Sequence, residues 1–150
     1  LAASTYFVIV TDANGCITTE NITLTEPAEL ICSVTRTDLL CFQDNSGTID
    51  LTVTGGTLPY IFAWTGPGGP YNTEDLSGLA AGTYSVIVTD ANGCITTENI
   101  TLTEPAELIC SVTGTDLLCF QDNSGTIDLT VSGGTLPYIF AWTGPGGPYS

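Results

Sequence analysis

The chain has 150 residues, and its charge already restricts its partners. Sixteen acidic residues stand against a single basic one, Arg36, and with no His the net charge is −15 at pH 7. Nucleic acids and anionic membranes both select Lys and Arg, so we expect neither as a partner. No apolar run approaches the length of roughly 18 residues that a membrane helix needs, so we expect no membrane span or signal peptide in this segment.

The sequence is one unit written almost twice. Residues 1–72 recur as residues 79–150, and only five of the 72 aligned pairs differ. These pairs are Ser4/Gly82, Phe7/Ser85, Arg36/Gly114, Thr54/Ser132 and Asn72/Ser150. An offset of 78 residues is too long for most solenoid repeats and is the size of a small domain. We therefore expect part of an array of domains, which serves length, reach or multivalency.

Alternating apolar and polar residues, punctuated by turn signals, predict strands and no helix. One complete unit is expected over residues 29–106, between the last two strands of one domain (1–28) and the first three of another (107–150). The expected strands of the complete unit span residues 29–35, 48–54, 59–65, a short one near 72–76, 83–89 and 95–103. Short strands with turns every eight to twelve residues are typical of an all-β sandwich.

Residue parity along these strands predicts the core. The inward set is Ile49, Leu51, Val53, Tyr60, Phe62, Trp64, Tyr84, Val86 and Val88. Its aromatic members have two interpretations, a face that stacks on carbohydrate or core packing, and shared parity on a central strand favours the core. Four apolar residues fall on the opposite, nominally wet face: Ile61, Ala63, Ile87 and, in the first copy, Phe7. Such residues can mark an interaction surface, so we expect lateral packing between domains or filaments there.

Two acidic turns are candidates for calcium, which prefers hard oxygen ligands. One contains Asp44, and the other contains Asp90 and Asn92. Because such side chains also hydrogen-bond the backbone of their own turns, the alternative is turn chemistry without an ion, and we favour that alternative. We expect no other cofactor. We also expect no enzyme, because the chain lacks His, a nucleophile elbow and a phosphate-binding loop, and its only Arg is missing from the second copy.

Several motifs together resemble a known repeat family. Residues 55–64 read GGTLPYIFAW, residues 76–84 read LSGLAAGTY, residues 88–94 read VTDANGC and residues 102–105 read LTEP. In this order they resemble SprB-type repeats, which occur in very large cell-surface proteins of gliding and other Bacteroidetes. The resemblance implies Ig-like or PKD-like sandwiches, secretion to the cell surface, and a filamentous or adhesive role.

The six cysteines indicate disulfides rather than zinc, because there is no His and no C-x-x-C pair. Six cysteines allow 15 pairings, which the residues alone leave open. The resemblance implies a bond between Cys41 and Cys94 of the complete unit, so that Cys16 and Cys119 find partners outside this segment. Cys32 and Cys110 remain, each as a free thiol or as a partner in a bond to a neighbouring domain or chain.

These features predict the structural unit of an extracellular tandem-repeat filament or adhesin stalk. Residues 103–107 are short and contain Pro105, so neighbouring units, the expected partners, should be held stiffly. Two alternatives stay open. One is a multivalent module that binds glycans such as surface polysaccharide, and the other is a short subunit that self-assembles by strand complementation.

Overall fold

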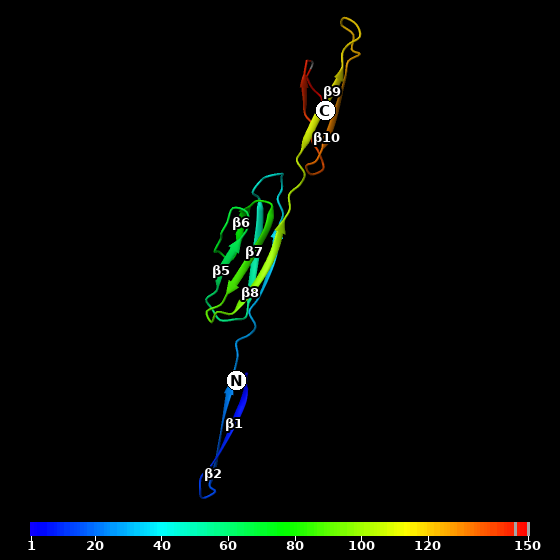
Figure 1. Ribbon diagram of the computed structural model, residues 1–150. Helices are drawn as coiled ribbons and strands as arrows, with labels where there is room; N and C mark the ends of the chain where they lie inside the picture. Colours follow the sequence, from blue (N-terminus) through cyan, green and yellow to red (C-terminus); the bar gives the residue numbers. More distant parts are fainter. Residues whose placement is uncertain (146, 150) are drawn as a thin grey trace.

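The computed structural model describes residues 1–145 and 147–149, and every regular element in them is a strand (Figure 1). The strands are β1 (Ser4–Thr11), β2 (Ile17–Leu24), β3 (Ile31–Thr37), β4 (Gly47–Thr54), β5 (Ile61–Thr65), β6 (Leu76–Leu79), β7 (Gly82–Thr89), β8 (Ile95–Leu102), β9 (Ile109–Thr115), β10 (Thr126–Ser132), β11 (Trp142–Gly144) and β12 (Gly147–Tyr149). The expected all-β class is confirmed. None of the described residues builds a helix with the length and apolarity needed to traverse a bilayer.

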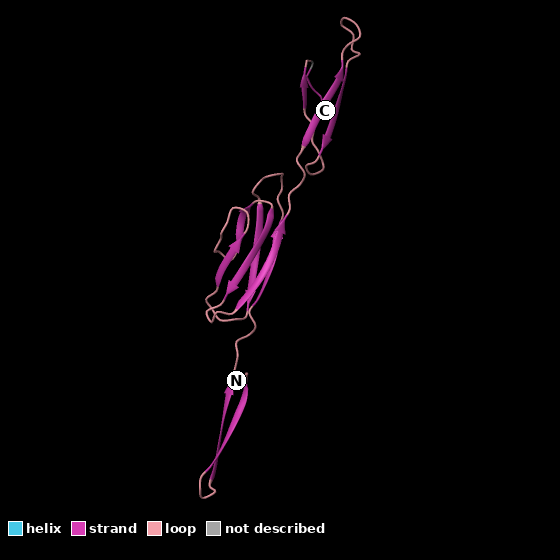
Figure 2. Cartoon of the chain, in the orientation of Figure 1, coloured by secondary structure: helices cyan, strands magenta, loops and turns pink. Residues whose placement is uncertain are grey.

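Strands β3 to β8 form one two-layered sandwich, with smaller strand pairs beyond each end (Figure 2). One sheet has the order β3-β4-β6 and the other the order β5-β7-β8, and every pairing is antiparallel. Strands β3 and β8 lie beside each other across the two sheets, where the Cys32 Sγ is 3.6 Å from the Thr96 Oγ1.

Among the described residues, the core of this sandwich comes from its own strands and loops. Its buried members are Cys32, Leu39, Ile49, Leu51, Trp64, Leu76, Leu79, Tyr84, Val86, Val88 and Leu102. The predicted inward residues Val53, Tyr60 and Phe62 pack against this cluster, so the core assigned by parity is confirmed. Trp64 is 1% exposed and its indole N–H donates to the Thr73 carbonyl at 3.0 Å, which rules out stacking of its ring on a sugar in the complete unit. Because none of the described residues outside 29–106 belongs to this core, we expect the unit of residues 29–106 to fold by itself.

Tyr84 fixes the corner that leads into β7. Its hydroxyl donates to the Ala80 carbonyl four residues upstream at 2.9 Å, and Tyr6 makes the same bond to Ala2 at 2.8 Å. A Tyr near the start of this strand that bonds back across the corner is also found in immunoglobulin-type sandwiches. Burial and the nearby Tyr71 raise the pKa of Tyr84.

One predicted strand was misplaced. The short strand expected near residues 72–76 lies at Leu76–Leu79, where it pairs with the start of β4. Residues before it are held in a turn instead, because the Thr73 hydroxyl donates to the Asp75 carbonyl and the Asp75 carboxylate accepts the Leu51 N–H across the loop.

Candidate functional site at the junction between repeats

The complete unit has two distinct ends. We call the end where the chain arrives, formed by residues 28–30, 55–60 and 90–94, the leading end. The end where it departs, formed by residues 38–46 and 103–106, is the trailing end. In Figure 1 the loop between β3 and β4 lies at the trailing end, beside the segment that continues towards β9. Both ends are built from polar contacts between residues far apart in the sequence.

At the trailing end, loop 38–46 holds the departing chain. The Thr103 carbonyl accepts from the Leu39 N–H at 3.0 Å, and the Glu104 Oε2 accepts from the Gln43 N–H at 2.6 Å. Leu39 anchors the loop itself, since its side chain is buried in the core. The first residues of the linker are therefore fixed to the unit that they leave.

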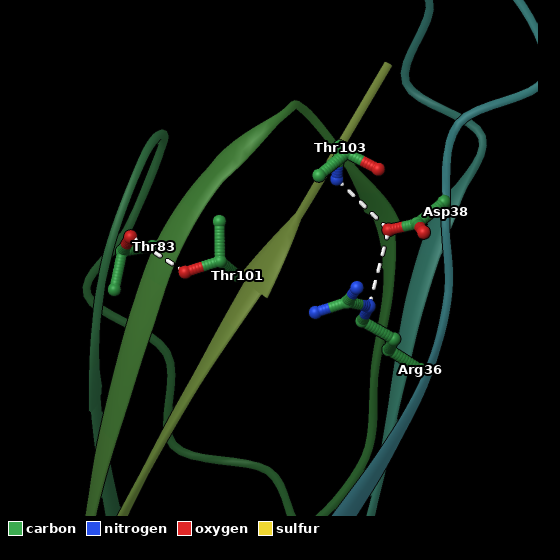
Figure 3. Close-up of polar contacts among 5 residues, drawn as sticks. All are labelled: Arg36, Asp38, Thr83, Thr101 and Thr103. Carbon is green, nitrogen blue, oxygen red and sulfur yellow. Dashed lines mark hydrogen bonds and ion pairs between the residues drawn. The ribbon is translucent and has the colours of Figure 1, made fainter. Parts of the chain in front are cut away.

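Asp38 makes the third of these contacts (Figure 3). Its Oδ1 accepts from the Thr103 N–H at 2.8 Å and lies 3.2 Å from the Arg36 Nε. The Thr103 N–H is the main reason that the pKa of Asp38 lies below its ordinary value, and the Arg36 guanidinium adds a smaller attraction. Figure 3 also shows the Thr83 and Thr101 hydroxyls, 2.9 Å apart, which join β7 to β8 just before the linker.

At the leading end, the arriving chain crosses a Gly-Gly turn. Gly55 and Gly56 have φ angles of 74° and 60°, a left-handed conformation that glycine adopts without strain. The Gly56 N–H donates to the Ala28 carbonyl at 2.8 Å. In the following unit the Gly134 N–H donates to the Ala106 carbonyl at the same 2.8 Å, so both linkers are bound by their Gly-Gly turns in the same way.

Asp90 ties the β7–β8 turn to Thr57, the residue that follows the Gly-Gly turn. The side chain is 3% exposed; its Oδ1 accepts from the N–H groups of Asn92 at 2.9 Å and Cys94 at 2.8 Å, and its Oδ2 accepts from Thr57 at 2.9 Å. Burial acts to raise the pKa of Asp90, but these N–H donors together lower it below the ordinary value. The carboxylate therefore locks the turn onto the residue that follows the Gly-Gly pair.

We predict that Asp90→Asn lowers the melting temperature of the 29–106 unit at pH 7 by about 5–10 °C, because an amide NH2 must then face a backbone N–H. The pKa of Asp90 is lower in the folded chain than in the unfolded chain, where it is near 3.8. The ionised carboxylate therefore stabilises the fold at pH values above 3.8, and this stabilisation is lost as the pH falls through the folded-state pKa. The difference in melting temperature between wild type and variant should therefore shrink below about pH 4, as thermal melts at pH 7 and pH 3 would show. Asp50→Asn, on the exposed face of β4, is the control. A difference in melting temperature between wild type and Asp90→Asn that did not depend on pH would contradict the role of the Asp90 carboxylate.

The two candidate calcium turns lie at opposite ends of the complete unit. Asp44 lies at the trailing end, whereas Asp90 and Asn92 lie at the leading end. Asp44 resembles Asp90, since its Oδ2 accepts from the Cys41 N–H at 2.9 Å and its Oδ1 from the Ser46 hydroxyl at 2.7 Å. No three His, Cys, Asp or Glu side chains in the described part of the chain are grouped to hold a metal ion. Hydrogen bonding explains these aspartates, and we propose no calcium site.

The cysteines also differ from the expected arrangement. Cys41 lies at the trailing end and Cys94 at the leading end, so the eight-residue strand β8, roughly 26 Å long, separates them. A disulfide needs Cα atoms within about 7 Å, so the pair expected within one unit does not fit. Cys32 is 6% exposed and lies inside the core, which favours the free-thiol alternative for it. Its counterpart Cys110 is exposed on the partial unit.

The structure does bring three of the four outward apolar residues together. Ile61, Ala63 and Ile87 are exposed on the outer face of the β5-β7-β8 sheet, where Ala63 is paired directly with Ile87. Phe7 lies on β1 in the partial first unit, and its counterpart in the complete unit is Ser85. Lateral packing through this face stays a prediction.

Between the trailing end and the next unit lies a cleft of about 390 Å³ that sequence reasoning missed. The loop of the complete unit contributes Leu40, Cys41 and Phe42, and the next unit contributes Gly134 and Thr135. Residues 105–108, between the two units, also line it. The cleft is thus shared by two consecutive repeats.

A family profile described as the SprB repeat matches residues 33–69 and again residues 111–147. These two segments are SprB repeats. Neither a curated protein nor a solved structure matches the chain significantly. Each SprB match starts within the first strand of a unit and contains Cys41 or its counterpart Cys119, the Gly-Gly turn and the aromatic strand. The resemblance read from the motifs is confirmed.

Proposed function

We propose that this chain is a structural segment of an extracellular tandem-repeat filament or adhesin stalk on a bacterial surface. SprB repeats are associated with cell-surface proteins, which supports the location. The single observation that carries the mechanical role is the junction, where the complete unit binds its own departing linker through Asp38, Leu39 and Gln43. A linker held in this way transmits the orientation of one unit to the next.

Charge supports the same role. The units carry almost only negative charge, and like charges along a chain repel one another and favour extension. The exposed aromatic groove that a glycan-binding module needs is not formed by the aromatic strand of the complete unit, because Trp64 is buried and Tyr60 and Phe62 pack against the core. Binding of a glycan array by the 29–106 unit would favour that module instead.

The test uses a chain with two complete units. Residues 29–150 followed by residues 73–106 continue the repeat, because Ser150 occupies the position of Asn72. We expect small-angle scattering, with the thiols reduced, to show an elongated particle with a narrow distribution of lengths. Combined Asp38→Ala and Glu104→Ala should broaden this distribution, because the linker loses two of its three holds on the loop.

Combined Asp50→Ala and Glu107→Ala is the matched control, since both acids are exposed, Glu107 lies in the same linker, and the two substitutions together remove the same charge as the test pair. Equal broadening by the control would assign the effect to charge alone. A compact or widely bent wild-type chain would overturn the proposed mechanical role.

A second candidate, self-assembly by strand complementation, is favoured by one specific observation. Strands β9 and β10 leave open a groove of about 630 Å³, lined by apolar residues that include Leu108, Val112 and Leu129. In the complete unit the equivalent face is covered by β7 and β8, and the hairpin β1–β2 is a second version of those two strands. In this assembly the hairpin of another copy would cover the groove, and the test is argued in the Discussion.

A further inference from the structure

We propose that a disulfide bond joins consecutive repeats, from Cys41 of one unit to the cysteine of the next unit that occupies the position of Cys94. This inference rests on the proposed serial array and adds a covalent bond to its junction. The next unit contains that position 78 residues beyond Cys94 wherever the array continues.

The first partner, Cys41, already faces the next unit. It is an exposed thiol that lines the shared cleft together with Gly134 and Thr135 of the following repeat. Its loop is held in place on one side by the hydrogen bond between the Asp44 carboxylate and the Cys41 N–H, and on the other by the bond between Gln43 and Glu104. Cys41 is therefore fixed in position rather than carried on a free loop.

The second partner is brought to the same cleft by the turn that contains it. In the complete unit this turn is bound to Thr57: the Ala91 N–H donates to the Thr57 carbonyl at 2.9 Å, and the Asn92 amide donates to its hydroxyl at 2.9 Å. Asp90 holds the Thr57 N–H and the Cys94 N–H with its two oxygens. Cys94 is thus positioned relative to Thr57.

Thr135 is the counterpart of Thr57, and the local structure around it is the same. Gly133 and Gly134 have φ angles of 72° and 61°, close to those of Gly55 and Gly56, and the bond to the arriving linker has the same length. In the complete following unit, the turn equivalent to residues 90–93 would bind Thr135 as the 90–93 turn binds Thr57. Its cysteine is then placed at the cleft that Cys41 lines. The two thiols then meet across the junction, whereas within one unit β8 separates them.

The chemistry needs only an organic disulfide as oxidant. Two S–H bonds are broken and one S–S bond is formed, and the two protons and two electrons reduce the oxidant's disulfide to two thiols. Such exchange proceeds in the oxidising surroundings expected for a surface protein.

The bond has a mechanical consequence. Each disulfide closes a loop that starts at the trailing end of one unit and ends after the β7–β8 turn of the next, so it encloses most of both folded repeats. A pulling force then passes through the S–S bond and bypasses the strands between. The array becomes resistant to extension without any change in its fold.

The experiment uses the two-unit chain described above, with Cys32 and Cys110 replaced by Ser to remove the other thiols. It is incubated with oxidised and reduced glutathione, and its disulfides are mapped by mass spectrometry of non-reduced peptides. We expect one bond, from Cys41 to the cysteine of the appended segment, with the first-unit Cys94 and Cys119 left free because each faces an end without a neighbour. Cys41→Ser should abolish the bond, and Cys119→Ser should leave it intact.

Bonds within each unit, Cys41 to Cys94 and Cys119 to the appended cysteine, would overturn the proposal, and so would free thiols at all four positions in a folded protein. Scattering from the same reduced chain separates the two claims. An elongated particle without the bond refutes the disulfide alone, and a particle that is not elongated refutes the serial array.

Discussion

Gly55→Ala should destabilise the 29–106 unit by about 3 kcal/mol or more, which lowers its melting temperature by at least about 12 °C. A Cβ at this position would lie 1.8 Å from the Glu29 carbonyl oxygen, in a backbone with φ of +74°. The added methyl cannot be accommodated unless the arriving linker moves away, and then the bond from Gly56 to Ala28 is lost as well. Thermal and urea unfolding of the two proteins would measure the difference.

Gly93→Ala is the matched control, because it has φ of +85° with nothing within 4 Å of its Cβ position. It should cost only about 1 kcal/mol, the backbone strain without the clash. Equal losses at the two positions would show that conformation alone explains Gly55. A Cβ added at Gly133 would likewise lie 1.8 Å from the Glu107 carbonyl oxygen, so the Gly-Gly turn has the same requirement at the next junction.

The fold of the complete unit was largely predictable because its strands are short and strictly alternating. Burial of Ile49, Leu51, Tyr84, Val86 and Val88 follows directly from parity, since successive side chains of a strand point to opposite faces. The resemblance to SprB repeats was predictable for a similar reason: the motifs are local runs of residues. Neither inference required knowledge of which strands pair.

The junction could not be predicted in this way, because its contacts join residues distant in the sequence. Asp38 and Thr103 are 65 residues apart, and nothing in either segment identifies its partner. Leu39 was missed for a related reason: it lies in a loop without periodicity, yet its side chain is in the core.

The cysteine pairing shows how topology overrides position. Cys41 comes shortly before β4, and Cys94 comes directly before β8, so both precede a strand. However, β4 and β8 run in opposite directions, and the starts of such strands lie at opposite ends of a sandwich. The sequence predicts where strands begin but not which way they run in space, and for that reason a pair that is plausible within one unit fits better between two.

Val8→Asp should abolish self-association of the 150-residue polypeptide if strand complementation operates. Val8 is 51% exposed on β1, but its counterpart in the complete unit, Val86, is 1% exposed in the core. In a complemented sandwich the hairpin of one copy would cover the groove beside β9 and β10 of another, so Val8 would become buried there. A carboxylate at that position would lose its hydration without a partner, which should weaken association by at least about 100-fold. Light scattering after size exclusion, over increasing protein concentration, would measure it.

Ile9→Asp is the matched control for this experiment. Ile9 neighbours Val8 on the same strand and is 67% exposed, but its counterpart Ile87 is on the outer face of the complete unit and stays exposed there. The two substitutions add the same charge to the same hairpin, and only one of them points into the groove. Loss of association in Val8→Asp with retention in Ile9→Asp would identify the hairpin as the strand donor. A wild-type polypeptide that remained monomeric, or two variants that behaved alike, would remove strand complementation and favour the continuous array over it.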